Sequence, residues 1–291
     1  MKAAPFAYHR PGTVAEATEL LGGFGDDAKI LAGGQSLVPM LAMRLTHFEN
    51  LIDISRIDEL RDIDRRGDTV WVGAGTPHAL VGLDDEVAES VPLLTRSTPF
   101  IGHFQIRTRG TLGGAIAHAD PAAEYAAVAL TLDAEIEATS TRGSRRIPAA
   151  DFFTGLWETA LAADEVLTGV GFPVWSGRCG FSVQEFARRH GDFAIAGATV
   201  AVELGDDGTV TRCAIGLLGL GPTPRRATVA ERAVLGRPVA ELSAQEVGRL
   251  AVAGLDDVPT DLQGSASYRS RVGATMVARA WTEATKEALD A

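Results

Sequence analysis

Residues 111–124 of the chain read TLGGAIAHADPAAE and combine a Gly-Gly pair, a hydroxyl side chain and the start of a helix. The two glycines can adopt positive φ and let a ligand approach the backbone without interference from a Cβ atom. Their N–H groups can then converge on an anion. Asp120 and Pro121 are typical of an N-cap and a first helical position, which predicts a helix over 122–130. The stretch therefore predicts a phosphate-binding loop followed by a helix.

A second Gly-Gly pair lies upstream, in residues 30–41, which read ILAGGQSLVPML. An apolar run precedes this pair, which begins at Gly33. Gln35 and Ser36 follow the pair, and a second apolar segment comes after them. Either pair taken alone is more often an ordinary turn than a ligand site. Two pairs with similar polar neighbours and few acidic residues favour a diphosphate held between two glycine-rich loops, as in a dinucleotide cofactor.

These stretches also carry a resemblance to a known family. AGGQSLVPML (32–41) and QIRTRGTLGGAIAHADPAAE (105–124) resemble the FAD-binding medium subunit of the molybdenum hydroxylases, the family of xanthine dehydrogenase and aerobic carbon monoxide dehydrogenase. The resemblance extends over essentially the whole chain. It implies an α+β fold, with an FAD-binding domain of the PCMH type made of two α+β subdomains and then a C-terminal three-stranded antiparallel sheet with helices.

The periodicity of apolar residues agrees with that order of elements. A polar break at 175–178 predicts an FAD-binding domain over 1–176, with subdomains at about 1–55 and 56–176, and a C-terminal domain over 177–291. A charged hairpin excursion is expected over 59–68, between two predicted strands. The predicted strands are 29–32, 50–54, 69–74, 134–138, 165–170, 180–187, 198–204 and 210–218. The predicted helices are 13–21, 76–81, 86–96, 227–235, 243–255 and 267–289.

A third glycine cluster, GGFGDDA at 22–28, formally matches the Gly-x-Gly-x-x-Ala of Rossmann proteins. That fingerprint must follow a strand and open a helix, whereas this cluster follows a predicted helix and precedes a predicted strand. Asp26 and Asp27 would also repel a pyrophosphate. We interpret the cluster as a turn.

Backbone N–H groups from Gly33 to Ser36 and from Gly113 to Ala115 are the expected pyrophosphate donors, with the hydroxyls of Ser36 and Thr111 as further donors. A turn or cap hydrogen bond is the alternative role for each hydroxyl. With the contacts that the resemblance implies, the predicted cofactor-binding residues are Ala32, Gly33, Gly34, Gln35, Ser36, Leu37, Thr111, Leu112, Gly113, Gly114, Ala115, Asp120, Glu124, Leu167, Gln184 and Phe193.

Charged side chains near the second glycine pair have two interpretations each. Phosphates repel a carboxylate, so Asp120 and Glu124, besides stabilising a helix N-terminus, suit the ribityl or ribose end of the cofactor that the resemblance implies. Arg107 and Arg109 would point the same way on an extended strand. There they face anionic cofactor atoms or an acidic partner, or else they form surface ion pairs.

Three further contacts rest on the resemblance. Leu167 corresponds to an apolar position beside the flavin, although a leucine within a strand is more often part of the core. Gln184 stands where relatives often have a lysine near the flavin, which leaves Arg188 as the alternative source of positive charge. Phe193 falls at an aromatic position that in relatives lies against the isoalloxazine ring, and a core phenylalanine is the alternative.

Composition limits the partners, the location in the cell and the metal sites that we expect for this chain. The net charge of −11 opposes binding to nucleic acid or to an anionic membrane, and no apolar run approaches the ~20 residues of a membrane span. The N-terminus has no apolar signal-peptide core, so we expect a cytoplasmic protein. Two distant cysteines cannot hold an iron–sulfur cluster, and the six histidines show no zinc spacing. No metal site is expected in this chain, and no set of nucleophile and base indicates catalytic residues.

By resemblance, the chain is expected to be the FAD-carrying electron-transfer subunit of a heterotrimeric molybdenum hydroxylase. A large partner subunit carries the molybdopterin, a small partner carries two [2Fe–2S] clusters, and two heterotrimers form a dimer. The substrate and the terminal electron acceptor are left open, because that chemistry lies on other chains. The alternatives are a stand-alone FAD-dependent oxidoreductase of the same superfamily and a cofactor-free interaction subunit.

Overall fold

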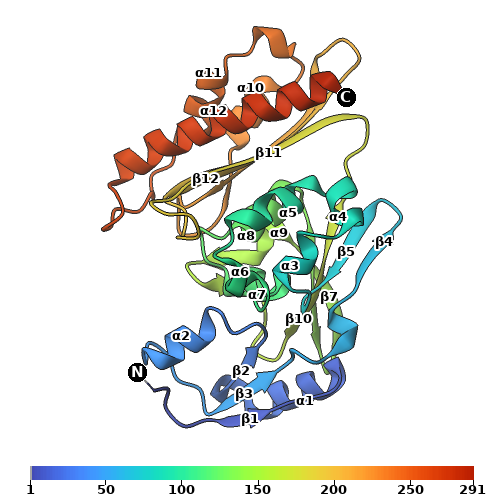
Figure 1. The fold of residues 1–291 in the computed structure, drawn as a ribbon, viewed down its shortest axis with the longest axis vertical. Helices are drawn as coiled ribbons and strands as arrows, with labels where there is room; N and C mark the ends of the chain where they lie inside the picture. Colours follow the sequence, from blue (N-terminus) through green and yellow to red (C-terminus); the bar gives the residue numbers. More distant parts are fainter. Residues whose placement is uncertain (1) are drawn as a thin grey trace.

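The computed structural model describes residues 2–291 and contains three larger β-sheets stacked along its long axis (Figure 1). The first sheet lies at the N-terminal end, and the third carries the long C-terminal helix across it. This arrangement confirms the predicted α+β class. Within residues 2–291, no helix is both long enough and apolar enough to cross a membrane.

The first sheet is parallel and has the order β1-β3-β2. Its helix α1 begins after Thr13, whose hydroxyl accepts a hydrogen bond from the N–H of Glu16. α1 runs on through Gly22 and Gly23, so the predicted turn over 22–28 is confined to η1. The elements are β1 (Ala7–His9), α1 (Val14–Phe24), η1 (Gly25–Asp27), β2 (Ala28–Leu31), α2 (Leu37–Ala42), β3 (Asn50–Asp53) and η2 (Asp58–Leu60).

The second sheet is antiparallel, with the order β4-β5-β10-β6-β7. Helices α7 and α8 pack their apolar side chains into the same core as this sheet. The strands are β4 (Ile63–Arg66), β5 (Thr69–Gly73), β6 (Glu135–Ser140), β7 (Gly143–Pro148) and β10 (Val166–Pro173), with β8 (Phe153–Gly155) and β9 (Glu158–Thr159) as a separate hairpin. The helices are α3 (His78–Val81), α4 (Asp85–Ser90), α5 (Pro92–Ser97), η3 (Thr98–Phe100), α6 (Phe104–Arg107), α7 (Leu112–His118), α8 (Glu124–Thr131) and α9 (Ala149–Phe152).

The third sheet contains the three antiparallel strands expected from the sequence and one short additional strand. Helix α12 lies across β11 and β12 (Figure 1). A Cβ atom on Gly180 would lie 1.9 Å from the carbonyl oxygen of Ala284, so glycine lets strand and helix approach closely. The elements are β11 (Arg178–Phe186), β12 (Ala196–Leu204), β13 (Val210–Leu218), β14 (Arg225–Arg226), α10 (Thr228–Val234), η4 (Val239–Glu241), α11 (Ala244–Ala251) and α12 (Ala266–Asp290).

Polar contacts join the second sheet and its helices to the third sheet. Arg96 on α5 donates two hydrogen bonds to the carboxylate of Glu287 on α12, at 2.6 and 2.7 Å, and one to the carbonyl oxygen of Phe181. The same carboxylate accepts from the N–H of Phe181 at 2.9 Å. Further along, the N–H of Gly219 donates to the carbonyl of Pro121 at 2.8 Å. The turn before α8 is therefore anchored to the third sheet.

Candidate functional site

The two glycine segments meet in the folded chain. A Cβ atom on Gly33 would lie 2.1 Å from the carbonyl oxygen of Arg109 and 2.6 Å from the Cα of Gly110. One on Gly114 would lie 3.6 Å from the Cβ of Ala32. Only a residue without a side chain allows the first of these contacts, so Gly33 is required for the approach of the segments and not for an unusual φ.

Free backbone donors are concentrated in the first segment. Gly34 adopts a φ of 72°, which turns the chain from β2 into α2. The side chain of Gln35 braces this turn by donating to the carbonyl of Gly33 at 2.9 Å. Within residues 2–291, none of five successive backbone N–H groups donates a hydrogen bond: those of Gly33, Gly34, Gln35, Ser36 and Leu37. We call residues 33–37 the amide cradle.

Ser36 and Thr111 keep hydroxyl protons available beside the cradle. Ser36 makes no capping bond to α2, so its predicted alternative role as a cap is not realised. Thr111 caps α7, because its Oγ1 accepts from the N–H of Gly114 at 3.1 Å. Its own O–H donates to no group in residues 2–291. Both hydroxyls can therefore donate to an anion.

The second glycine pair does not form the loop of free amides that the sequence predicts. Gly113 and Gly114 lie in the first turn of α7, with helical φ. The N–H of Gly113 donates to Ala74 at 2.9 Å, and the N–H of Ala115 donates to Thr111 at 3.0 Å. The predicted pyrophosphate donors at 113–115 are therefore already partnered within the chain. Gly113 is instead needed for packing, since its Cβ would lie 2.4 Å from that of Ala74.

Asp120 was predicted to be the N-cap of the next helix, but Ala123 occupies that position. Its Oδ1 accepts from the N–H of Ala122 at 2.9 Å, which makes a tight turn ahead of α8. Helix α8 begins at Glu124 after Ala123, two residues later than predicted. This turn directly follows Ala119, which ends α7 in the left-handed region with a φ of 54° and so changes the direction of the chain. The second carboxylate oxygen of Asp120 faces outward, where the indole N–H of Trp157 donates to it at 3.4 Å.

The third sheet presents Glu185, and not Gln184, toward this region. Gln184 donates to Glu283 on α12 at 2.8 Å, which turns its side chain away from the glycine segments. Successive residues of a strand point to opposite faces, so the neighbouring Glu185 points toward α8. Its Oε2 is buried and has no hydrogen-bond partner within residues 2–291. Glu185 was not among the predicted site residues, although strand alternation at β11 could have indicated it.

Glu124 and Glu185 form a carboxyl pair with raised pKa values. Burial raises the pKa of Glu124 from 4.5 to about 7, and the charge of Asp120 adds to this effect. Burial and the charge of Glu124 raise the pKa of Glu185 to about 9. Two carboxylates that share a dry site cannot both ionise cheaply. At neutral pH this pair therefore holds at least one proton.

Arg107 and Arg109 do not lie on a strand. Arg107 ends α6, and its guanidinium donates to the carbonyls of Ile101 and Gly102 at 3.1 and 2.9 Å. The carbonyl of Arg109 contacts the first glycine segment, while its side chain is exposed. The expectation that both guanidinium groups point the same way from an extended strand is therefore wrong.

The remaining predicted contacts have different environments. Leu167 is buried in β10 as part of the core of the second sheet. Phe193 lies between β11 and β12 and is 58% exposed, so it is not a core phenylalanine. In the same loop, a Cβ atom on Gly191 would lie 2.8 Å from the ring of His103, so this loop packs against the start of α6. Arg188 is exposed.

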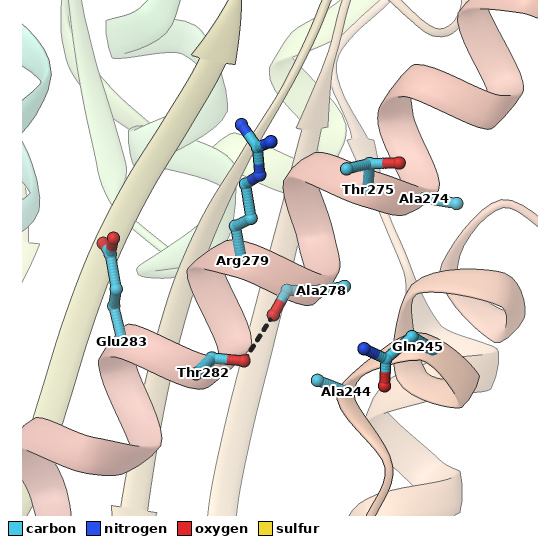
Figure 2. Close-up of a pocket in the computed structure, with 8 residues that line it drawn as sticks. All are labelled: Ala244, Gln245, Ala274, Thr275, Ala278, Arg279, Thr282 and Glu283. Atoms are coloured by element: carbon cyan, nitrogen blue, oxygen red, sulfur yellow. Dashed lines mark hydrogen bonds between the residues drawn. The ribbon is translucent and has the colours of Figure 1, made fainter.

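Two hollows in residues 2–291 are lined by none of the predicted cofactor-binding residues. Figure 2 shows one of about 460 Å³ between α11 and α12, lined by small and polar side chains such as Ala274, Thr275 and Gln245. Another, of about 670 Å³, lies beside β1 and α1. Residues 2–291 contain no group of three or more histidine, cysteine, aspartate or glutamate residues that could hold a metal ion.

Known proteins are similar to this chain in both sequence and fold. Residues 4–175 match the model of the FAD binding domain in molybdopterin dehydrogenase, and residues 181–284 match that of the CO dehydrogenase flavoprotein C-terminal domain. The chain is 39% identical to the 6-hydroxypseudooxynicotine dehydrogenase complex subunit alpha of Paenarthrobacter nicotinovorans, covering 100% of both chains. It is 36% identical to the carbon monoxide dehydrogenase medium chain of Hydrogenophaga pseudoflava, covering 94% of this chain and 95% of the relative.

Solved structures of related enzymes contain chains with the same fold as this one. A chain of the carbon monoxide dehydrogenase from Hydrogenophaga pseudoflava superimposes with a TM-score of 0.95 at 37% identity, covering 99% of each chain. A chain of quinoline 2-oxidoreductase from Pseudomonas putida 86 superimposes with a TM-score of 0.93 at 33% identity, covering 99% of this chain and 100% of that one. The similarity thus extends over both matched segments.

Proposed function

Since this chain belongs to the family of FAD-binding medium subunits of the molybdenum hydroxylases, we propose that it is the electron-transfer subunit of a heterotrimeric dehydrogenase of that kind. On this proposal the chain would hold FAD, and the bound cofactor would supply the redox step between the [2Fe–2S] clusters of a small partner subunit and a terminal acceptor. A large molybdopterin subunit oxidises the substrate. We further propose that two heterotrimers pair and that the complex works in the cytoplasm.

The observation that carries this proposal is the amide cradle lying against the N-terminus of α7. Five backbone N–H groups and two hydroxyls in these segments donate no hydrogen bond, and a bound diphosphate would satisfy such donors. No acidic residue occurs between Ala32 and Leu37, so nothing there repels the anion. The donor set fits the pyrophosphate of FAD.

The rest of the chain would position the cofactor. We assign residues 32–37 and Thr111 to its pyrophosphate, and Leu112 to Ala115 to the wall beside it. Asp120, Glu124 and Phe193 lie toward its sugar and ring portions, and Glu185 replaces Gln184 in this set. We also propose the division into a cofactor domain over 1–176, with subdomains at about 1–55 and 56–176, and a C-terminal domain over 177–291.

The chemistry comes from the cofactor, because bound FAD can exchange electrons singly or in pairs. The chain's own residues would bind the cofactor, orient it and shield it from solvent. The amide cradle neutralises negative charge without a mobile cation, and the Glu124–Glu185 pair holds a proton next to α8. The sequence indicates no nucleophile with an adjacent base, which suits a subunit that relays electrons.

Purification of the chain with and without its partner subunits tests the proposal. We expect the chain to show flavin absorption bands, and its flavin to be reduced by the substrate only when the molybdenum and iron–sulfur subunits are present. A colourless protein that gains no flavin spectrum on adding FAD would overturn the proposal. A yellow protein that alone oxidises a substrate catalytically would support the stand-alone oxidoreductase instead.

Replacement of Thr111 separates its two roles. Thr111→Val removes the cap of α7 and the free hydroxyl, so we expect a loss of about 1 kcal/mol in the free energy of unfolding and roughly tenfold weaker FAD binding. Thr111→Ser keeps both functions and should remain within about twofold of wild type. Flavin fluorescence titration and urea unfolding measure the two effects. Equal FAD affinity in both variants would remove Thr111 from the site.

A further inference from the structure

Backbone strain gathers at the end of α7 that lies away from the amide cradle. Ala119 ends the helix with a φ of 54°, and Trp157 forms the tip of the β8–β9 hairpin with a φ of 57°. These are two of the four residues other than glycine with positive φ among residues 2–291. Such backbone is unfavourable for a bulky side chain and tends to occur at ligand sites. A hairpin tip without a function would be expected to carry glycine or asparagine here.

The side chain of Trp157 is held in place by residues from the second glycine stretch. Its indole N–H donates to Asp120 at 3.4 Å, across 37 positions of sequence. Its ring lies nearly parallel to that of His118, with an interplanar angle of 15° and centroids 6.3 Å apart. Burial lowers the pKa of His118, which keeps the imidazole neutral at neutral pH. The indole is thus oriented on one side by two partners.

Much of this oriented ring is open to solvent. Trp157 is 55% exposed, and Leu156 beside it is 53% exposed. Tryptophan usually buries its large apolar surface, so a fixed indole with an open face is suited to cover a flat ligand ring. Helix α7 spans seven residues, or about 10 Å at 1.5 Å per residue, between Thr111 and this cluster. The sugar portions of FAD likewise separate each of its ring systems from the pyrophosphate.

We propose that Trp157 covers one of the two flat ring systems of bound FAD, with Asp120 and His118 setting the angle of its indole. The inference rests on the proposed function, because it requires FAD in the amide cradle. The two candidate rings, isoalloxazine and adenine, share the chemistry of stacking on an indole.

Fluorine NMR of the full chain labelled with 5-fluorotryptophan tests this contact directly. The four tryptophans give separate resonances, and the signal missing in Trp157→Phe identifies the one of interest. We expect FAD to shift the Trp157 resonance more than those of buried Trp71, Trp175 and Trp281. A matching shift with FMN places the isoalloxazine at Trp157, and one with ADP places the adenine there. An unshifted resonance in a protein with a flavin spectrum overturns the inference and leaves the proposed function intact, whereas failure to bind FAD overturns both.

Substitutions at the hairpin tip separate ligand contact from folding. Trp157→Gly removes the ring and relieves the left-handed backbone, so the cofactor-free protein should melt at the same or a higher temperature while FAD binds at least about tenfold more weakly. Trp157→Phe keeps a ring and should lose less affinity. Leu156→Ala is the matched control, since it alters an equally exposed neighbour and should leave FAD affinity unchanged. An unaltered FAD affinity in Trp157→Gly would contradict the proposal.

Discussion

Gly33→Ala is expected to abolish tight FAD binding. The added Cβ would lie 2.1 Å from the carbonyl oxygen of Arg109, and neither atom belongs to a side chain that can rotate away. The two glycine segments must then separate, which displaces the amide cradle from Thr111. Overpacking of this kind costs about 3 kcal/mol, and we expect roughly 100-fold weaker FAD binding with a comparable loss in the free energy of unfolding.

Gly23→Ala is the matched control for this substitution. Gly23 lies within α1 and has a negative φ, and a Cβ atom added to it would meet no other atom within 4 Å. Alanine favours a helix over glycine by up to about 1 kcal/mol, so this variant should be at least as stable as wild type. Flavin fluorescence titration and chemical unfolding of both variants measure the effects. A Gly33→Ala protein that binds FAD with wild-type affinity would show that the two segments need not touch.

Raising the pH from 5 to 9 is expected to destabilise the cofactor-free protein through Glu124 and Glu185. Their pKa values are raised in the folded chain, to about 7 and about 9, above the 4.5 of an ordinary glutamate. Between pH 4.5 and the raised pKa of each group, the folded state binds more protons than the unfolded state, so the stability of the folded state falls as the pH rises. One pKa unit corresponds to about 1.4 kcal/mol. Allowing for local relaxation, we expect a loss on the order of 3 kcal/mol.

Glu185→Gln should flatten this dependence, because the amide keeps the shape of the side chain and cannot ionise. Thermal unfolding at a series of pH values then compares wild type with this variant. Glu89→Gln, at an exposed position of α4, provides the matched control and should follow the wild-type profile. A wild-type profile in the Glu185→Gln protein would mean that the carboxyl pair is not the source of the pH effect.

The sequence predicted the third sheet well because its strands carry strong signals. β11, β12 and β13 are long, with many apolar residues, and Asp206, Asp207 and Gly208 mark the turn between the last two. The strands that were not predicted lack such signals. β4 and β7 expose most of their side chains, so they show little apolar alternation, and β14 has only two residues. Their pairing partners, and not their own composition, make them strands.

The candidate site was predicted in position but not in detail. Both glycine pairs could be recognised, yet their sequence cannot tell a glycine needed for positive φ, such as Gly34, from one needed for a close contact, such as Gly113. The choice between Gln184 and Glu185 depends on strand register, where a shift of one residue reverses the face. The sequence gives no signal for the contact that we propose for Trp157, because its partners His118 and Asp120 are distant in sequence.

The junction between Arg96, Phe181 and Glu287 has a consequence for how the protein is made. Arg96 and Glu287 are 191 positions apart, so the first emerges from the ribosome long before its partner exists. Segments generally fold as they are synthesised, N-terminal parts first. The nascent chain must therefore hold β11 without this anchor until the last turns of α12 have been translated.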